Sequence, residues 1–123
     1  MPIIRPHDAE LFTAHGSTFA SYVSQTRGAR ELCAWRLTVP AGQTGVAHRP
    51  SNEEVLLVLE GSLSVSLNGL VEEAGVGDVI VIPSNSEVKI DGGETDSTAW
   101  VTTTSGLQAT TADGAVLSPP WAR

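Results

Sequence analysis

Residues 42–61 read GQTGVAHRPSNEEVLLVLEG, a segment that places an imidazole and a carboxylate just before a strand-like run. Its spacing is G-x5-H-x-P-x3-E-x6-G, and His48 and Glu54 are side chains of the kind that bind metals or move protons. Pro50 stands two residues after His48 and its side chain has no lone pair to donate. The run Glu54–Glu60 is rich in branched apolar residues, which predicts a strand buried on both faces.

The neighbouring segments also predict strands. Ser62–Leu67 (SLSVSL) alternates polar and apolar residues, and Asn68-Gly69 then supplies the dipeptide typical of a type I′ hairpin turn. No helical periodicity is sustained after residue 30, so the chain is predicted to be all-β, a sandwich or a closed barrel. Further strands are expected at Arg30–Val39, Val79–Ile82, Glu87–Ile90 and Thr98–Thr104.

The 123 residues suit one domain with a single core, the barrel of residues 30–104. Residues 1–29 are expected to form an N-terminal segment with a short helical turn at Ala9–Phe12 and one additional strand at Phe19–Ser24. Residues 105–123 are expected to pack on the barrel or on a partner subunit. We favour the subunit contact for Trp121, because a lone exposed tryptophan is costly to leave in water.

Composition excludes several classes of partner. Fourteen acidic residues against seven basic ones give a net charge of −7, and no basic cluster is present to neutralise phosphates, so nucleic acid is not expected. The longest apolar run, Val55–Leu59, is too short to cross a bilayer, so no membrane contact is expected either. Asp8 and Glu10 interrupt any secretory leader, which favours a cytoplasmic location. Cys33 has no cysteine partner and is expected to be a small buried residue.

Two segments resemble the two motifs of the cupin superfamily, small β-barrels of the jelly-roll type. The first motif of that superfamily runs G-x5-H-x-H-x3 or 4-E-x6-G. This chain matches it at Gly42, His48, Glu54 and Gly61, whereas Pro50 replaces the second histidine.

The second motif of the superfamily runs G-x5-P-x-G-x2-H-x3-N. Gly77 and Pro83 match it, and Asn85 stands at the usual glycine, a mild change because asparagine tolerates a left-handed backbone. Val88 stands where the histidine ligand would be. The resemblance covers about residues 30–104 and implies a single cupin-type jelly-roll β-barrel, a fold that hosts many functions.

The resemblance implies a metal site with an incomplete set of ligands. Cupin metals are held by the two histidines and the glutamate of the first motif and by the histidine of the second, so only His48 and Glu54 carry over. Two ligands seldom hold a metal, so we expect no cofactor. A divalent metal remains possible if Asn52, Glu53 or Cys33 completes the site.

The sequence leaves several functions open. The leading hypothesis is a barrel that binds a small organic molecule and acts as a metal-independent isomerase, epimerase, cyclase or lyase, with His48 as base and Glu54 orienting it. An apolar cavity beside Pro50 and Val88 would raise the pKa of Glu54. The alternatives are an oxygenase or hydrolase dependent on Fe, Mn, Zn or Ni, and a non-enzymatic binding or sensing domain.

A purely structural role also stays open for Glu54, as the ion-pair partner of Arg36 or Arg49. His7 and His15 lie in the N-terminal segment and are expected at the surface. The residues expected to contact a substrate are Trp35, Arg36, Val58, Val88 and Trp100.

Strand alternation places Trp35 and Arg36 on opposite faces but does not say which of the two points inward. The resemblance further implies a homodimer that pairs through outer sheet faces. The apolar residues Leu57, Leu59 and Val79–Ile82 fit that pairing.

Overall fold

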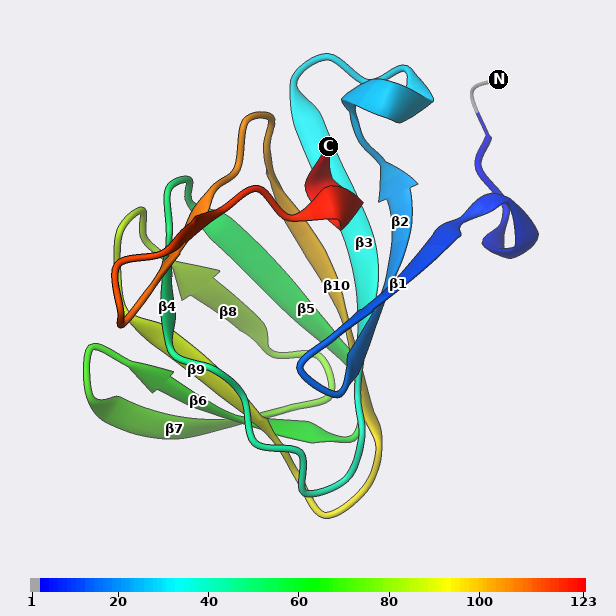
Figure 1. Cartoon of the computed structure of the whole chain (residues 1–123). Coiled ribbons are helices and arrows are strands. Elements are labelled where there is room, and N and C mark those ends of the chain that lie inside the picture. The colour runs from blue at the N-terminus through cyan, green and yellow to red at the C-terminus, as the bar shows by residue number, and fades with distance from the viewer. Residues whose placement is uncertain (1–2) are drawn as a thin grey trace.

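The computed structural model describes residues 3–123 and consists of two six-stranded antiparallel sheets (Figure 1). One sheet has the order β1-β2-β3-β10-β5-β8 and the other has the order β12-β11-β4-β9-β6-β7. The strands are β1 (Glu10–Ala14), β2 (Ser17–Val23), β3 (Leu32–Val39), β4 (His48–Pro50), β5 (Glu54–Glu60), β6 (Ser62–Leu67), β7 (Leu70–Gly75), β8 (Val79–Ile82), β9 (Val88–Gly92), β10 (Ser97–Thr104), β11 (Ala109–Thr111) and β12 (Val116–Leu117), and the 3-10 helices are η1 (Pro6–Asp8), η2 (Gln25–Arg27) and η3 (Pro120–Ala122).

The predicted all-β architecture is confirmed, and its turns follow from local sequence. Asn68 and Gly69 have φ angles of 50° and 88°, as the type I′ turn between β6 and β7 requires. Asn85 has a φ of 63°, so asparagine adopts the left-handed backbone at the position where the second motif usually has glycine. No helix within residues 3–123 is long and apolar enough to span a membrane.

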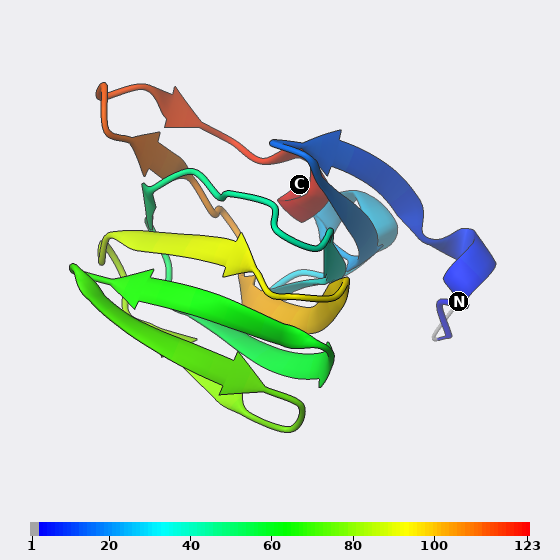
Figure 2. The same ribbon diagram turned by 90° about the horizontal axis from the view of Figure 1, so that it is seen from below.

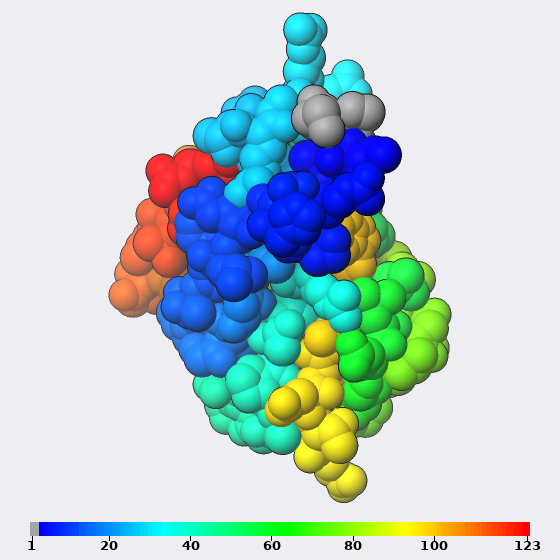
Figure 3. Space-filling view, turned by 90° about the vertical axis from the view of Figure 1, so that its right-hand side faces the viewer, coloured from blue at the N-terminus to red at the C-terminus, as the bar shows by residue number. Residues whose placement is uncertain are grey.

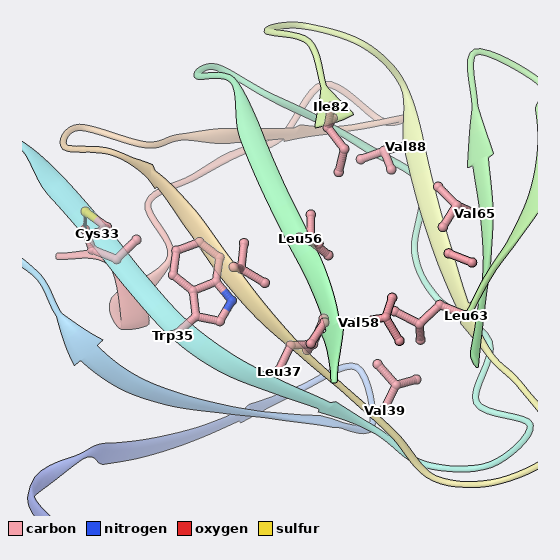
Figure 4. Close-up of a cluster of buried hydrophobic side chains, with 14 of the residues drawn as sticks. Cys33, Trp35, Leu37, Val39, Leu56, Val58, Leu63, Val65, Ile82 and Val88 are labelled. Atoms are coloured by element: carbon pink, nitrogen blue, oxygen red, sulfur yellow. Dashed lines mark hydrogen bonds between the residues drawn. The ribbon is translucent and has the colours of Figure 1, made fainter. Parts of the chain in front are cut away.

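The hydrophobic core lies between the two sheets, where alternate residues of each strand point inward (Figure 4). Trp35 points inward from β3, which settles the choice between it and its neighbour Arg36. Full burial of one leucine or valine side chain contributes roughly 1.5–3 kcal/mol. The largest fully buried apolar side chains are Leu56, Val58, Leu63, Ile82 and Val88.

The outer face of β5 is not buried, contrary to the prediction from its uniformly apolar sequence. Val55, Leu57 and Leu59 are 38%, 38% and 36% exposed, whereas the alternating residues of β5 face the core. Composition alone cannot distinguish a strand buried within one chain from a strand whose outer face is apolar but uncovered. The apolar outer face of β5 therefore remains open in the single chain.

The N-terminal segment contributes two strands to the first sheet. The additional strand expected at Phe19–Ser24 is present as β2, but the helical turn expected at Ala9–Phe12 is wrong. Three of those four residues are the first residues of β1, which pairs with β2, and the 3-10 turn lies earlier, with Pro6 at its first position. Tertiary pairing has overridden a weak local preference.

The C-terminal segment packs on the barrel of its own chain, not outward as we favoured. The Trp121 ring stacks on Phe19 with ring centroids 3.7 Å apart and an interplanar angle of 11°. The carbonyl of Trp121 accepts a hydrogen bond from the Ser21 hydroxyl at 2.7 Å. Similar bonds join the carbonyls of Ala122 and Arg123 to Cys33 and Thr26. Figure 2 shows the C-terminal strands and the blue β1–β2 hairpin on the same side of the barrel.

Candidate functional site

A cavity of about 400 Å³ lies between the inner faces of the two sheets. Residues of β3, β4 and β5 form its inner walls, and the β1–β2 turn and the segment before η3 line it as well. The lining is predominantly apolar. A cavity of this size and character suits a small organic molecule.

Glu54, the first residue of β5, is the acidic group of this cavity. It is only 7% exposed, and burial raises its pKa to about 7. Neither arginine considered as a partner reaches it, because Arg36 pairs with Glu60 at 2.8 Å and Arg49 with Glu87 at 3.7 Å. A carboxyl without a counter-ion in an apolar wall is thus poised to exchange a proton near neutral pH.

The backbone at the start of β5 is held by its neighbouring strands, which fixes the position from which the Glu54 side chain extends. Thr103 on β10 lies opposite Glu54 in the β5–β10 register, and its hydroxyl donates a 2.7 Å hydrogen bond to the Glu53 carbonyl. Glu54 also pairs across to Ile82 on β8. The start of β5 is therefore fixed from both sides.

His48, the first residue of β4, also lines the cavity. Its Nδ1 lies 2.9 Å from the Val46 carbonyl oxygen, a geometry in which Nδ1 carries the proton and donates. The Val46 carbonyl thus occupies the orienting position that we expected Glu54 to take. No group within residues 3–123 forms a hydrogen bond to Nε2, which leaves the lone pair of that nitrogen available in the neutral ring.

The residues at the motif positions do not fit a resident metal. Pro50 lines the cavity without a donor atom. Val88 pairs with His48 in the β4–β9 register but is fully buried in the core. No three histidine, cysteine, aspartate or glutamate side chains of the described residues are grouped to hold an ion, and Cys33 is engaged with the Ala122 carbonyl. His48 and Glu54 therefore lack the additional ligands that a stable site needs.

The five residues expected to contact a substrate lie in three different places. Trp35 lines the cavity. Val58 and Val88 are core residues that do not border it (Figure 4). Arg36 and Trp100 face away, because Arg36 binds Glu60 and the Trp100 ring packs edge-on against Tyr22 at 5.2 Å.

The lining residues that the sequence reasoning did not assign to the site include His15, Phe19 and Trp121. The prediction that His15 lies at the surface is confirmed, since its side chain is exposed, but it stands at the cavity. The dipeptide His15-Gly16 between two alternating strands was the available signal for a hairpin. No local pattern shows where the tip of that hairpin docks.

The only titratable side chains among the described residues that line the cavity are those of His15, His48 and Glu54. Among residues 3–123, no lysine or arginine lines the cavity, which disfavours a ligand carrying phosphate or several carboxylates. The electrostatics of the cavity thus favour an uncharged ligand.

Comparison of the sequence with models of known protein families gives a match. The cupin domain family, Cupin_2, matches residues 35–101, the part of the chain that holds the inner walls of the cavity. A sequence comparison with curated proteins gave no match.

Solved cupin structures share this fold. The polyketide cyclase RemF from Streptomyces resistomycificus is similar over 85% of this chain and 79% of its own, with 21% identity and a TM-score of 0.76. An RmlC-like cupin from Shewanella frigidimarina is 18% identical over 85% and 90%, with a TM-score of 0.73. KdgF from Halomonas sp. is 18% identical over 85% and 93%, with a TM-score of 0.73. These likenesses establish the jelly-roll fold.

Proposed function

The chain belongs to the cupin family, and we propose that its barrel binds an uncharged, largely apolar organic molecule and that His48 and Glu54 move a proton from one atom of this molecule to another. One observation carries this proposal: a buried carboxyl with a pKa of about 7 and an imidazole with an unengaged Nε2 line the same apolar cavity. Groups that titrate near the working pH are the most effective proton donors and acceptors.

The two side chains have complementary roles. The Val46 carbonyl fixes the tautomer of His48, so Nε2 is the base that removes a proton from a carbon acid. Burial keeps a substantial fraction of Glu54 protonated near pH 7, so its carboxyl donates a proton to the substrate oxygen. The C–H electron pair moves into the enol double bond, and return of the proton to a different atom completes an isomerisation.

The same pair of transfers serves cyclisation and elimination. Ring closure by condensation needs a base at carbon and an acid at the departing or accepting oxygen. The structural likeness to a polyketide cyclase is compatible with this chemistry but, at 21% identity, supports the fold more than the reaction. No observation favours a metal-dependent reaction, because the ligand set does not fit a resident ion.

The exchange of carbon-bound protons for deuterium tests this proposal. 2-Tetralone, an uncharged bicyclic ketone with an acidic carbon next to its carbonyl, is incubated with the protein in D2O and followed by proton NMR. We expect exchange above the buffer rate, reduced about 100-fold in each of His48→Gln and Glu54→Gln. The rate should also fall as pH rises through about 7, because Glu54 then loses the proton that it donates.

Glu53→Gln is the matched control, because Glu53 is the exposed neighbour of Glu54. Exchange equal to that of wild type in both site variants would contradict proton transfer. If the variants then still bind the ketone, the barrel is a binding or sensing domain.

We also propose that the protein is a homodimer. The outward residues Val55, Leu57 and Leu59 of β5 adjoin Val79 and Val81 of β8, which are 58% and 52% exposed. Five neighbouring apolar side chains form a face of the kind that oligomers bury.

A further inference from the structure

His15 occupies an unusual position for an imidazole. It is the first residue of the two-residue turn between β1 and β2, closed by the pairing of Ala14 with Ser17. His15 and Gly16 have φ angles of 52° and 80°, as a type I′ turn requires. Asparagine or glycine meets this requirement with less strain and histidine is also enriched in this backbone region, so the turn accepts a histidine but does not require one.

The tip of this hairpin lies against the 40–47 loop. A Cβ added to Gly16 would collide with the side chain of Gln43, so the tip sits directly on the 40–47 loop. Figure 3 shows the blue hairpin between the red C-terminal end and the turquoise 40–47 loop. Gly45 and Val46 of that loop line the cavity together with His15. The backbone of His15 is therefore held at the mouth of the cavity.

The His15 ring is free to bind a ligand. It is exposed, lines the cavity and has no hydrogen-bond or ion-pair partner among residues 3–123. Glu54, by contrast, is buried deep in the wall. The titratable groups of the described lining thus differ in depth, with His15 exposed, His48 half-buried and Glu54 buried.

Three aromatic side chains lie in the otherwise mainly aliphatic wall of the cavity. Phe19, Trp35 and Trp121 line the cavity, half of the six aromatic residues of the chain. Flat rings pack favourably on such a wall. The absence of lysine and arginine from the described lining disfavours charged substituents.

We propose that His15 is a second polar contact for the ligand, and that the ligand is a flat, uncharged aromatic molecule with oxygen substituents at opposite ends. One hydroxyl or carbonyl lies at Glu54 and His48, and the other accepts from or donates to the His15 ring. The inference rests on the proposed function only in taking Glu54 and His48 as the inner contact.

Calorimetric titration with two matched probes tests this arrangement. 2,6-Dihydroxynaphthalene has an oxygen at both ends, whereas 2-naphthol has only one. Wild type should bind the dihydroxy probe about 3- to 10-fold more tightly, the contribution of one hydrogen bond. The variants His15→Gly and His15→Asn both preserve the left-handed turn, and both should lose most of this preference while 2-naphthol affinity stays unchanged.

His7→Gly is the control, because His7 lies on η1 outside the cavity lining. Equal weakening of both probes in the His15 variants would overturn the second contact, since it would report a general disturbance of the mouth. Failure of wild type to bind either probe at millimolar concentration would overturn the ligand class. Glu54→Gln tests the proposed function separately, because it should reduce deuterium exchange about 100-fold while the preference for the dihydroxy probe persists.

Discussion

Replacing Glu54 by glutamine should stabilise the protein at alkaline pH and have little effect at acid pH. The native carboxyl has a pKa of about 7 against an ordinary value of 4.5, because folding removes it from water without giving it a counter-ion. Below 4.5 the carboxyl is protonated in both states. Between 4.5 and about 7 the native state holds a proton that the unfolded state has lost, so the free energy of unfolding falls as pH rises.

The expected magnitude follows from that difference in pKa. At about 1.4 kcal/mol for each pH unit, the charged form of Glu54 costs the native state roughly 3 kcal/mol once the pH exceeds 7. Glutamine has nearly the same shape and no charge, so the variant avoids this cost. Glu54→Gln should therefore be more stable than wild type by up to about 3 kcal/mol at pH 8.5.

Urea unfolding at pH 4, 5.5 and 8.5 measures this effect. The difference between variant and wild type should grow with pH, and Glu53→Gln, which changes an exposed carboxylate, should show no such growth. A stability difference for Glu54→Gln that is the same at pH 4 and pH 8.5 would refute the reasoning, because the carboxyl would then be equally well solvated in both states.

The remaining predictions concern the metal, the outer face and the C-terminal segment. Protein purified without chelators or an affinity tag should contain no stoichiometric transition metal by mass spectrometry, and one bound ion per chain would contradict the donor set described here. Leu57→Arg should convert a dimer to a monomer in light scattering, whereas a monomeric wild type at micromolar concentration would remove the basis for the dimer. Trp121→Ala should lower the free energy of unfolding by about 3 kcal/mol, measured with urea, because it removes the stack on Phe19, and a loss below 1 kcal/mol would mean that the stack is unimportant.

The sequence predicted those features that local chemistry determines. Asn85 takes the left-handed backbone expected of it, and Glu54 opens its strand with the raised pKa expected of a carboxyl in an apolar wall. Turn chemistry is encoded in the residues of the turn itself, so a single short segment suffices to infer it.

Features that depend on distant segments escaped prediction. Leu57 on the outer face of β5 is as apolar as a core residue, and apolar composition does not say what covers a strand face. His15 and Trp121 reach the cavity only because the hairpin and the C-terminal segment fold back over it, and no periodicity in either segment encodes that return. Both residues belong to the ends of the chain, outside the two motifs.

The hydrogen bonds that anchor residues 121–123 have a consequence for the order in which the chain folds. They join residues 100, 97 and 89 positions apart, from the side chains of Ser21, Thr26 and Cys33 to the carbonyls of residues 121–123. Contacts of such long range close late, because the intervening chain must be ordered first. The cavity wall to which Trp121 contributes can therefore close only after the sheets have formed, so we expect ligand binding to be acquired late in folding.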